Sequence, residues 1–154
     1  MNSARNQLAG LQLIHKALLG GQLLFAAVLF FLMYTGKAEP GWRSLDRVLQ
    51  ALAIAVAAIA YLGGSKWYFT KKLQEARNST SIQQKFDHFK KGSLVQWALL
   101  ELATLFALIS FLLTGNLAFF MMAVMLIFIF ALLYPGPTKL AILLRETPED
   151  LKML

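Results

Sequence analysis

Residues 97–116, WALLELATLFALISFLLTGN, decide the fold predicted for this chain. The stretch is apolar, carries one carboxylate, Glu101, and ends in a Thr-Gly-Asn turn, after which a second apolar run starts at Leu117. Such a turn leaves almost no loop between two helices that are each suited to cross a bilayer. The pattern therefore predicts a transmembrane helical hairpin with an acid inside it.

Apolar residues are gathered in four blocks of this kind. The chain has 154 residues, of which 58% are hydrophobic, and its mean hydropathy is +0.58. The blocks are residues 17–34, 48–64, 94–113 and 117–134, each close to the roughly 17–25 residues that cross about 30 Å of hydrocarbon. Each must be a helix, because an open strand would leave peptide groups unpaired in lipid. We expect an all-α polytopic membrane protein, one domain over residues 1–154, with four transmembrane helices in a bundle.

The distribution of cations predicts the topology. Seven Lys and Arg residues lie between the second and third blocks, two before the first and three after the fourth, whereas only Lys37, Arg43 and Arg47 lie between the first and second. By the positive-inside rule, both termini and the middle segment are expected to be cytoplasmic, in the inner (plasma) membrane. The net charge of +7 is thus explained by topology, and nucleic acid is not an expected partner. The basic segment is expected to attract anionic lipid headgroups.

The polar segments also carry helical patterns. In the segment 66–93, Ile82, Phe86 and Phe89 fall on one helical face, which fits either a helical hairpin protruding from the membrane or a helix lying flat in the headgroups. In the tail 135–154, Thr138 is expected to cap a short amphipathic helix, and residues 147–150, TPED, resemble a second helix start.

Glu101 is the main candidate for chemistry. It lies about 15 Å along the helix beyond Lys91, near mid-membrane. A charged carboxylate is costly there, so we expect it to face the protein interior, together with Thr104, and to be protonated or partnered. Gln22 and Gln50 are candidate partners. If the turns 35–36 and 114–115 are superposed, Gln22 falls on Glu101, as in a parallel repeat. Two interpretations stay open: a proton or cation carrier, or a structural hydrogen bond to Gln22.

Other residues beside the apolar blocks have more ordinary expected roles. Hydroxyl groups inside a helix tend to bond back to their own helix, and this is expected of Thr104, Ser110 and Thr114. Small residues allow close helix packing, which is expected at Gly20, Gly21, Ala53 and Ala57. Aromatic residues favour the membrane interface, and the expected anchors are Trp42, Trp67 and Tyr68.

Several function classes are disfavoured by what the sequence lacks. It has no cysteine, and its two histidines, His15 and His88, are far apart, so we expect no metal site and no cofactor. Nucleophile, phosphate-loop and zinc-protease motifs are also missing. The favoured interpretation is a non-enzymatic subunit or assembly partner of a membrane complex, binding other membrane proteins or itself. The alternatives are a small proton- or cation-coupled transporter or channel using Glu101, and a four-span membrane enzyme.

Overall fold

The computed structural model describes residues 5–146, and within that range the chain is helical, without strands. The α-helices are α1 (Arg5–Tyr34), α2 (Asp46–Ile59), α3 (Thr70–Asn78), α4 (Ile82–Thr114), α5 (Leu117–Leu132) and α6 (Pro137–Leu144). A 3₁₀ turn, η1 (Arg43–Leu45), precedes α2, and a π-helical segment, η2 (Ala60–Phe69), joins α2 to α3. The predicted all-helical class is confirmed.

Three helices are long and apolar enough to cross a membrane: Gln7–Tyr34, Arg43–Asn78 and Ile82–Thr114. The fourth predicted block differs, because α5 has only 16 residues and meets that standard only together with α6, from which it is bent by 74°. Pro137 opens α6, and a proline cannot continue the hydrogen-bonding pattern of a preceding helix. The described chain therefore has three candidate spanning helices, or four if the bent pair is one span.

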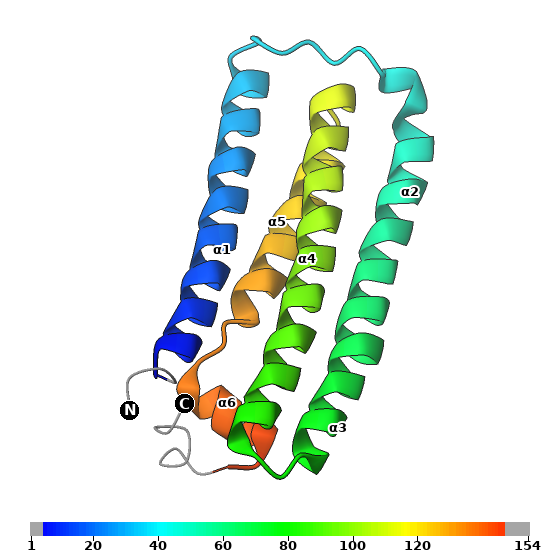
Figure 1. Ribbon diagram of the computed structural model, residues 1–154. Helices are drawn as coiled ribbons and strands as arrows, with labels where there is room; N and C mark the ends of the chain where they lie inside the picture. The colour runs from blue at the N-terminus through cyan, green and yellow to red at the C-terminus, as the bar shows by residue number, and fades with distance from the viewer. Residues whose placement is uncertain (1–4, 147–154) are drawn as a thin grey trace.

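α4 is the central helix of the bundle. Half of its apolar window is buried inside the protein, against 17% in each of the other two continuous spans. In Figure 1, α1 and the α2–η2–α3 rod stand on either side of α4, with α5 behind it. The α4–α5 turn is sharp, because Gly115 adopts φ +71° and donates its N–H to Phe111 O at 2.8 Å, the left-handed cap that ends many helices.

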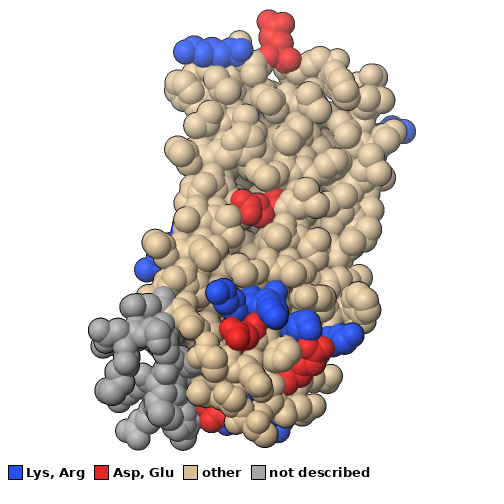
Figure 2. Space-filling view, in the orientation of Figure 1, with Lys and Arg blue, Asp and Glu red and all other residues tan. Residues whose placement is uncertain are grey.

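Charged side chains mark the two ends of the molecule differently. α4 has 33 residues and so extends over about 50 Å, beyond the roughly 30 Å of a hydrocarbon core. The part of α4 that exceeds this thickness lies at the end of the molecule that holds the α3–α4 turn and α6. We call this end the basic end. The opposite end, with the connection 35–42, is the loop end. Figure 2 shows most Lys, Arg, Asp and Glu side chains in the lower half, toward the basic end, and a largely uncharged face above them.

The basic end has an apolar core of its own. Phe86, Leu140 and Leu144 are fully buried there, in one cluster with Leu11 and Leu73. These residues come from α4, α6, α1 and α3, so α6 packs against the lowest turns of the bundle, below α5 (Figure 1). A salt bridge from Lys85 to Glu146 and a hydrogen bond from Arg77 Nε to Leu143 O at 2.9 Å fix α6 in place.

The helix-start signals of the tail had different outcomes. Thr138 was the predicted cap of α6, and this is wrong: Gly136 occupies the cap position, without a side-chain cap, and Pro137 the first turn. The physical reason is that proline suits the first helical position, which places Thr138 inside the helix. The predicted start at 147–150 lies outside the described residues.

Candidate functional site

Glu101 lies at the edge of the buried face of α4 and not within it. The buried face is formed by Trp97, Leu100, Thr104 and Leu108, none of which exposes more than 1% of its surface, whereas Glu101 is half-buried. Among the described residues, Glu101 has no hydrogen bond and no salt bridge, since neither kind of contact is found for its carboxylate. The expectation that it points inward with Thr104 therefore differs from the structure.

The side of α4 beside Glu101 is apolar and uncovered. Ala98, Leu102 and Ile109 are exposed, with 60% of Leu102 and 47% of Ile109 accessible, and Leu105 is half-buried beside them. These four residues, with Glu101 at their edge, form what we call the open face of α4. Because Ala98, Leu102 and Ile109 remain exposed within residues 5–146, the described bundle leaves this face free. The result is a carboxyl group that borders an apolar surface about midway between Lys91 and Thr114.

Two polar side chains of α1 point into the bundle instead. His15 and Gln22 each expose only 1% of their surface. His15 Nε2 donates to Phe130 O at 3.0 Å, and its ring stacks on Phe130 at 4.7 Å and meets Trp97 edge-on at 4.8 Å. Within the described part of the chain, His15 Nδ1, Trp97 Nε1 and both amide atoms of Gln22 have no hydrogen-bond partner. His15 is therefore a core residue that ties α1 to α5.

The predicted polar residues do not assemble into one site. Gln22 makes no hydrogen bond to Glu101, since its amide atoms have no partner among residues 5–146. Gln50 is half-buried on α2. Thr104 donates to Leu100 O at 2.9 Å, and Ser110 and Thr114 also bond back to carbonyls four residues earlier, as expected for hydroxyls inside a helix. Of the predicted set, Glu101 and Gln50 are half-buried and have no hydrogen bond within residues 5–146, and of these two only Glu101 can carry a charge.

The close packing of η2 against α4 was not predicted from the sequence. We call this contact, formed by Gly64, Ser65, Gln96 and Leu99, the η2–α4 seam. A Cβ atom added to Gly64 would lie 3.2 Å from Leu99 Cδ1 and 3.5 Å from Gln96 Cα, so glycine permits the close approach. Beside it, Gln96 Nε2 donates to Ser65 Oγ at 2.7 Å. The available signal was Gly63-Gly64-Ser65 at the end of one apolar block and Gln96 near the start of the next.

The small residues predicted to pack divide into two groups. Ala53 is buried and Ala57 half-buried, so the second span does use small side chains inside the bundle. Gly20 and Gly21 are exposed, and a Cβ atom added to either would meet nothing within 4 Å. No other part of the described chain therefore packs against these two glycines.

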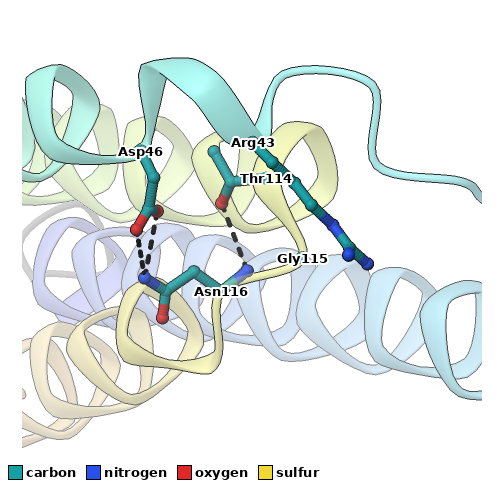
Figure 3. A pocket seen from close by; sticks show the side chains of 5 residues that line it. All are labelled: Arg43, Asp46, Thr114, Gly115 and Asn116. Carbon is teal, nitrogen blue, oxygen red and sulfur yellow. Dashed lines mark hydrogen bonds between the residues drawn. The ribbon is translucent and has the colours of Figure 1, made fainter.

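At the loop end, a polar contact joins two hairpins. Asn116 Nδ2 donates to both carboxylate oxygens of Asp46, at 3.0 and 2.8 Å, while its Oδ1 caps α5 by accepting from Ala118 N at 2.9 Å. Figure 3 shows this pair beside Thr114, which accepts from Asn116 N, and shows Arg43 extending away from it. A hollow of about 210 Å³ lies here. Because both oxygens of the Asp46 carboxylate accept from the Asn116 amide, we interpret this contact as one that holds the two hairpins together and not as a ligand site.

The predicted interfacial aromatics lie near the two ends of the second span. Trp42 is 52% exposed and donates its backbone N–H to Leu113 O at 3.0 Å. Trp67 is 73% exposed and Tyr68 half-buried, at the end of η2 toward the basic end. Both tryptophans expose more than half of their surface, and their role as interfacial anchors stays a prediction.

Residues 5–146 contain no group of three His, Asp or Glu side chains placed to hold a metal ion. Comparison with known proteins finds no matching protein family, characterised protein or solved structure. Glu101 beside the open face of α4 is an acid that no described residue pairs with a polar group.

Proposed function

We propose that this chain is a four-span membrane protein of the inner membrane, with both termini cytoplasmic, and a non-enzymatic subunit of a membrane complex. A transmembrane helix of another membrane protein packs on the open face of α4. In this proposal α5 is the fourth span, and α6 is its bent end at the cytoplasmic surface. The observation that carries the proposal is the half-buried Glu101 without a partner beside exposed Leu102.

The cost of leaving Glu101 against lipid supports a covering helix. A charged acid at the centre of a membrane costs about 2.5–3.5 kcal/mol on insertion scales, and a protonated acid still carries a donor and an acceptor that lipid tails do not satisfy. A polar side chain of a partner helix would supply a hydrogen bond across the contact, worth about 0.6–2 kcal/mol. Ala98, Leu102 and Ile109 would add apolar contact area around it.

The uncovered glycines of α1 offer a second surface for assembly. Gly20 and Gly21 are exposed, and nothing occupies the space above them. Helices in membranes associate largely through van der Waals packing, which small residues strengthen by letting backbones come close. The exposed glycines therefore support the proposal that another helix can pack closely on α1.

The test is mild-detergent purification from native membranes followed by mass spectrometry of the proteins that remain bound. Wild type and Glu101→Gln should retain the same stoichiometric membrane partner, because the amide keeps the polar group that the contact needs. Ala98→Trp should lose it, since a large ring on the open face prevents close packing. Met125→Trp is the matched control: Met125 is 55% exposed and lies on α5, not on α4.

Two outcomes would contradict the proposal. A chain that purifies alone or only with copies of itself, in wild type and in all variants, would exclude a hetero-complex subunit. A loss of proton or cation flux in liposomes on Glu101→Gln would favour the alternative, a small transporter that uses Glu101 as its carrier, because a carrier carboxyl cannot be replaced by an amide that does not titrate.

A further inference from the structure

A hollow of about 280 Å³ lies on one side of the second span, where η2 passes into α3. Its lining is two aromatic side chains followed by two lysines: Trp67, Tyr68, Lys71 and Lys72. The volume is at the lower limit of small-molecule sites, so the hollow suits one polar headgroup and not a whole lipid. It is separate from the open face of α4 and does not depend on the proposed function.

The depth of this hollow coincides with the headgroup layer. Asp46 begins α2 at the loop end, and Trp67 follows about 30 Å further along the same rod, which is the thickness of a hydrocarbon core. If Trp42 and Asp46 lie at one interface, Trp67 and Tyr68 lie at the other. Tryptophan and tyrosine favour that level because each combines an apolar ring with a hydrogen-bond donor.

The charge of the hollow is positive, but one of its cations is partly neutralised. Lys72 Nζ donates to Glu75 Oε2 at 2.5 Å and lies 6.0 Å from the centre of the Tyr68 ring. The same Glu75 oxygen is 3.2 Å from His88 Nδ1. Glu75, which contacts both Lys72 and His88, therefore competes with a ligand for Lys72. Lys71 forms no salt bridge in the described part of the chain, so it is the cation available to a ligand.

We infer that this hollow binds the phosphate of an anionic phospholipid headgroup. Lys71 supplies the main charge, and Lys72 joins it when it turns away from Glu75. The Trp67 N–H and Tyr68 O–H are donors that suit phosphate or glycerol oxygens, while their rings pack on the upper part of the acyl chains. Anionic lipids of the cytoplasmic leaflet are attracted to basic segments beside a membrane span. The hollow would bind one such headgroup at a defined position.

The experiment is native mass spectrometry of the purified full-length chain with an equimolar mixture of phosphatidylglycerol and phosphatidylcholine. We expect one phosphatidylglycerol to be retained preferentially. Lys71→Gln should weaken its binding about fivefold, the factor that corresponds to about 1 kcal/mol per lysine near an anionic surface. Lys71→Arg should keep it. Glu75→Gln should strengthen it, because Lys72 is then released from its carboxylate partner.

Lys91→Gln is the matched control. Lys91 is exposed at the basic end and carries the same charge, but it does not line the hollow, so its loss removes only diffuse attraction and should weaken binding less than Lys71→Gln does. Equal weakening by Lys71→Gln and Lys91→Gln would show diffuse attraction only and overturn the inference. Equal retention of the two lipids, or displacement of the lipid by an equimolar amount of inorganic phosphate, would also overturn it, because the site would then not select a lipid headgroup.

Discussion

The left-handed turn at Gly115 permits a sharp test of how the loop end is packed. A Cβ atom at Gly115 would lie 2.7 Å from Pro40 Cγ and 3.3 Å from Met33 Cε, and φ there is +71°. Gly115→Ala therefore adds two costs. Backbone strain in the left-handed region is about 1–2 kcal/mol for a residue with a side chain, and overpacking against the rigid proline ring costs about 1–3 kcal/mol.

Gly36 provides the control for this substitution. It also has a positive φ, +66°, but nothing lies within 4 Å of an added Cβ atom. Gly36→Ala should therefore cost only the strain, about 1–2 kcal/mol, whereas Gly115→Ala should cost about 2–5 kcal/mol in the free energy of unfolding. The difference between the two variants measures the contact with Pro40.

The assay is reversible unfolding in mixed detergent micelles, followed by circular dichroism, for Gly115→Ala and Gly36→Ala in both the wild-type and the Pro40→Ala backgrounds. Removing the proline ring should reduce the cost of Gly115→Ala to about that of Gly36→Ala. If the two glycine substitutions cost the same in the wild-type background, the loop 35–42 does not pack on the α4–α5 turn, and the reasoning is refuted.

Three further experiments, which use five substitutions, test the contact between η2 and α4 and the core of the basic end. Gly64→Val should destabilise the protein by about 1–3 kcal/mol through overpacking, whereas Gly63→Val, with nothing within 4 Å of an added Cβ, should change stability by about 0.5 kcal/mol or less; equal effects would contradict the close seam. A double-mutant cycle of Ser65→Ala and Gln96→Leu should give a coupling energy near 0.6 kcal/mol, the average for hydrogen bonds between membrane helices; zero coupling would remove that bond. Phe86→Ala should cost about 3–5 kcal/mol in the same unfolding assay, because the ring is fully buried; a loss below about 1 kcal/mol would contradict the core at the basic end.

Hydropathy was enough to predict where the helices run, because each apolar block must pair its own backbone groups. The first block ends at Tyr34, as α1 does, and the third lies inside α4. The fourth block, 117–134, begins with α5 and ends two residues beyond Leu132, just before Pro135 and Pro137. Hydropathy counts this block as a full span, but it does not give the 74° angle between α5 and α6, which depends on the backbone of the connection at residues 133–136.

The side chains that meet were harder to predict than the helices that carry them. A helical period shows that Trp97 and Thr104 share a side of α4, but only the positions of the neighbouring helices decide that Glu101 lies at the edge of that side. The contact between Asn116 and Asp46 joins residues 70 positions apart, and the Thr-Gly-Asn turn that contains Asn116 does not indicate Asp46 as its partner. The π-helical segment that brings Ser65 to Gln96 likewise has no signal in the periodicity.

The most direct test of the central proposal is photo-crosslinking in native membranes from the open face of α4. A photoreactive amino acid at Leu102 is compared with one at Met121, since both side chains are 60% exposed and they lie on different helices. We predict that Leu102 forms an adduct of one defined mass with another membrane protein, that Ala98→Trp abolishes this adduct, and that Met121 gives only lipid adducts. If both positions give the same lipid adducts and no protein adduct, the open face is covered by lipid alone, and the chain is not held in a complex through Glu101 and its neighbours.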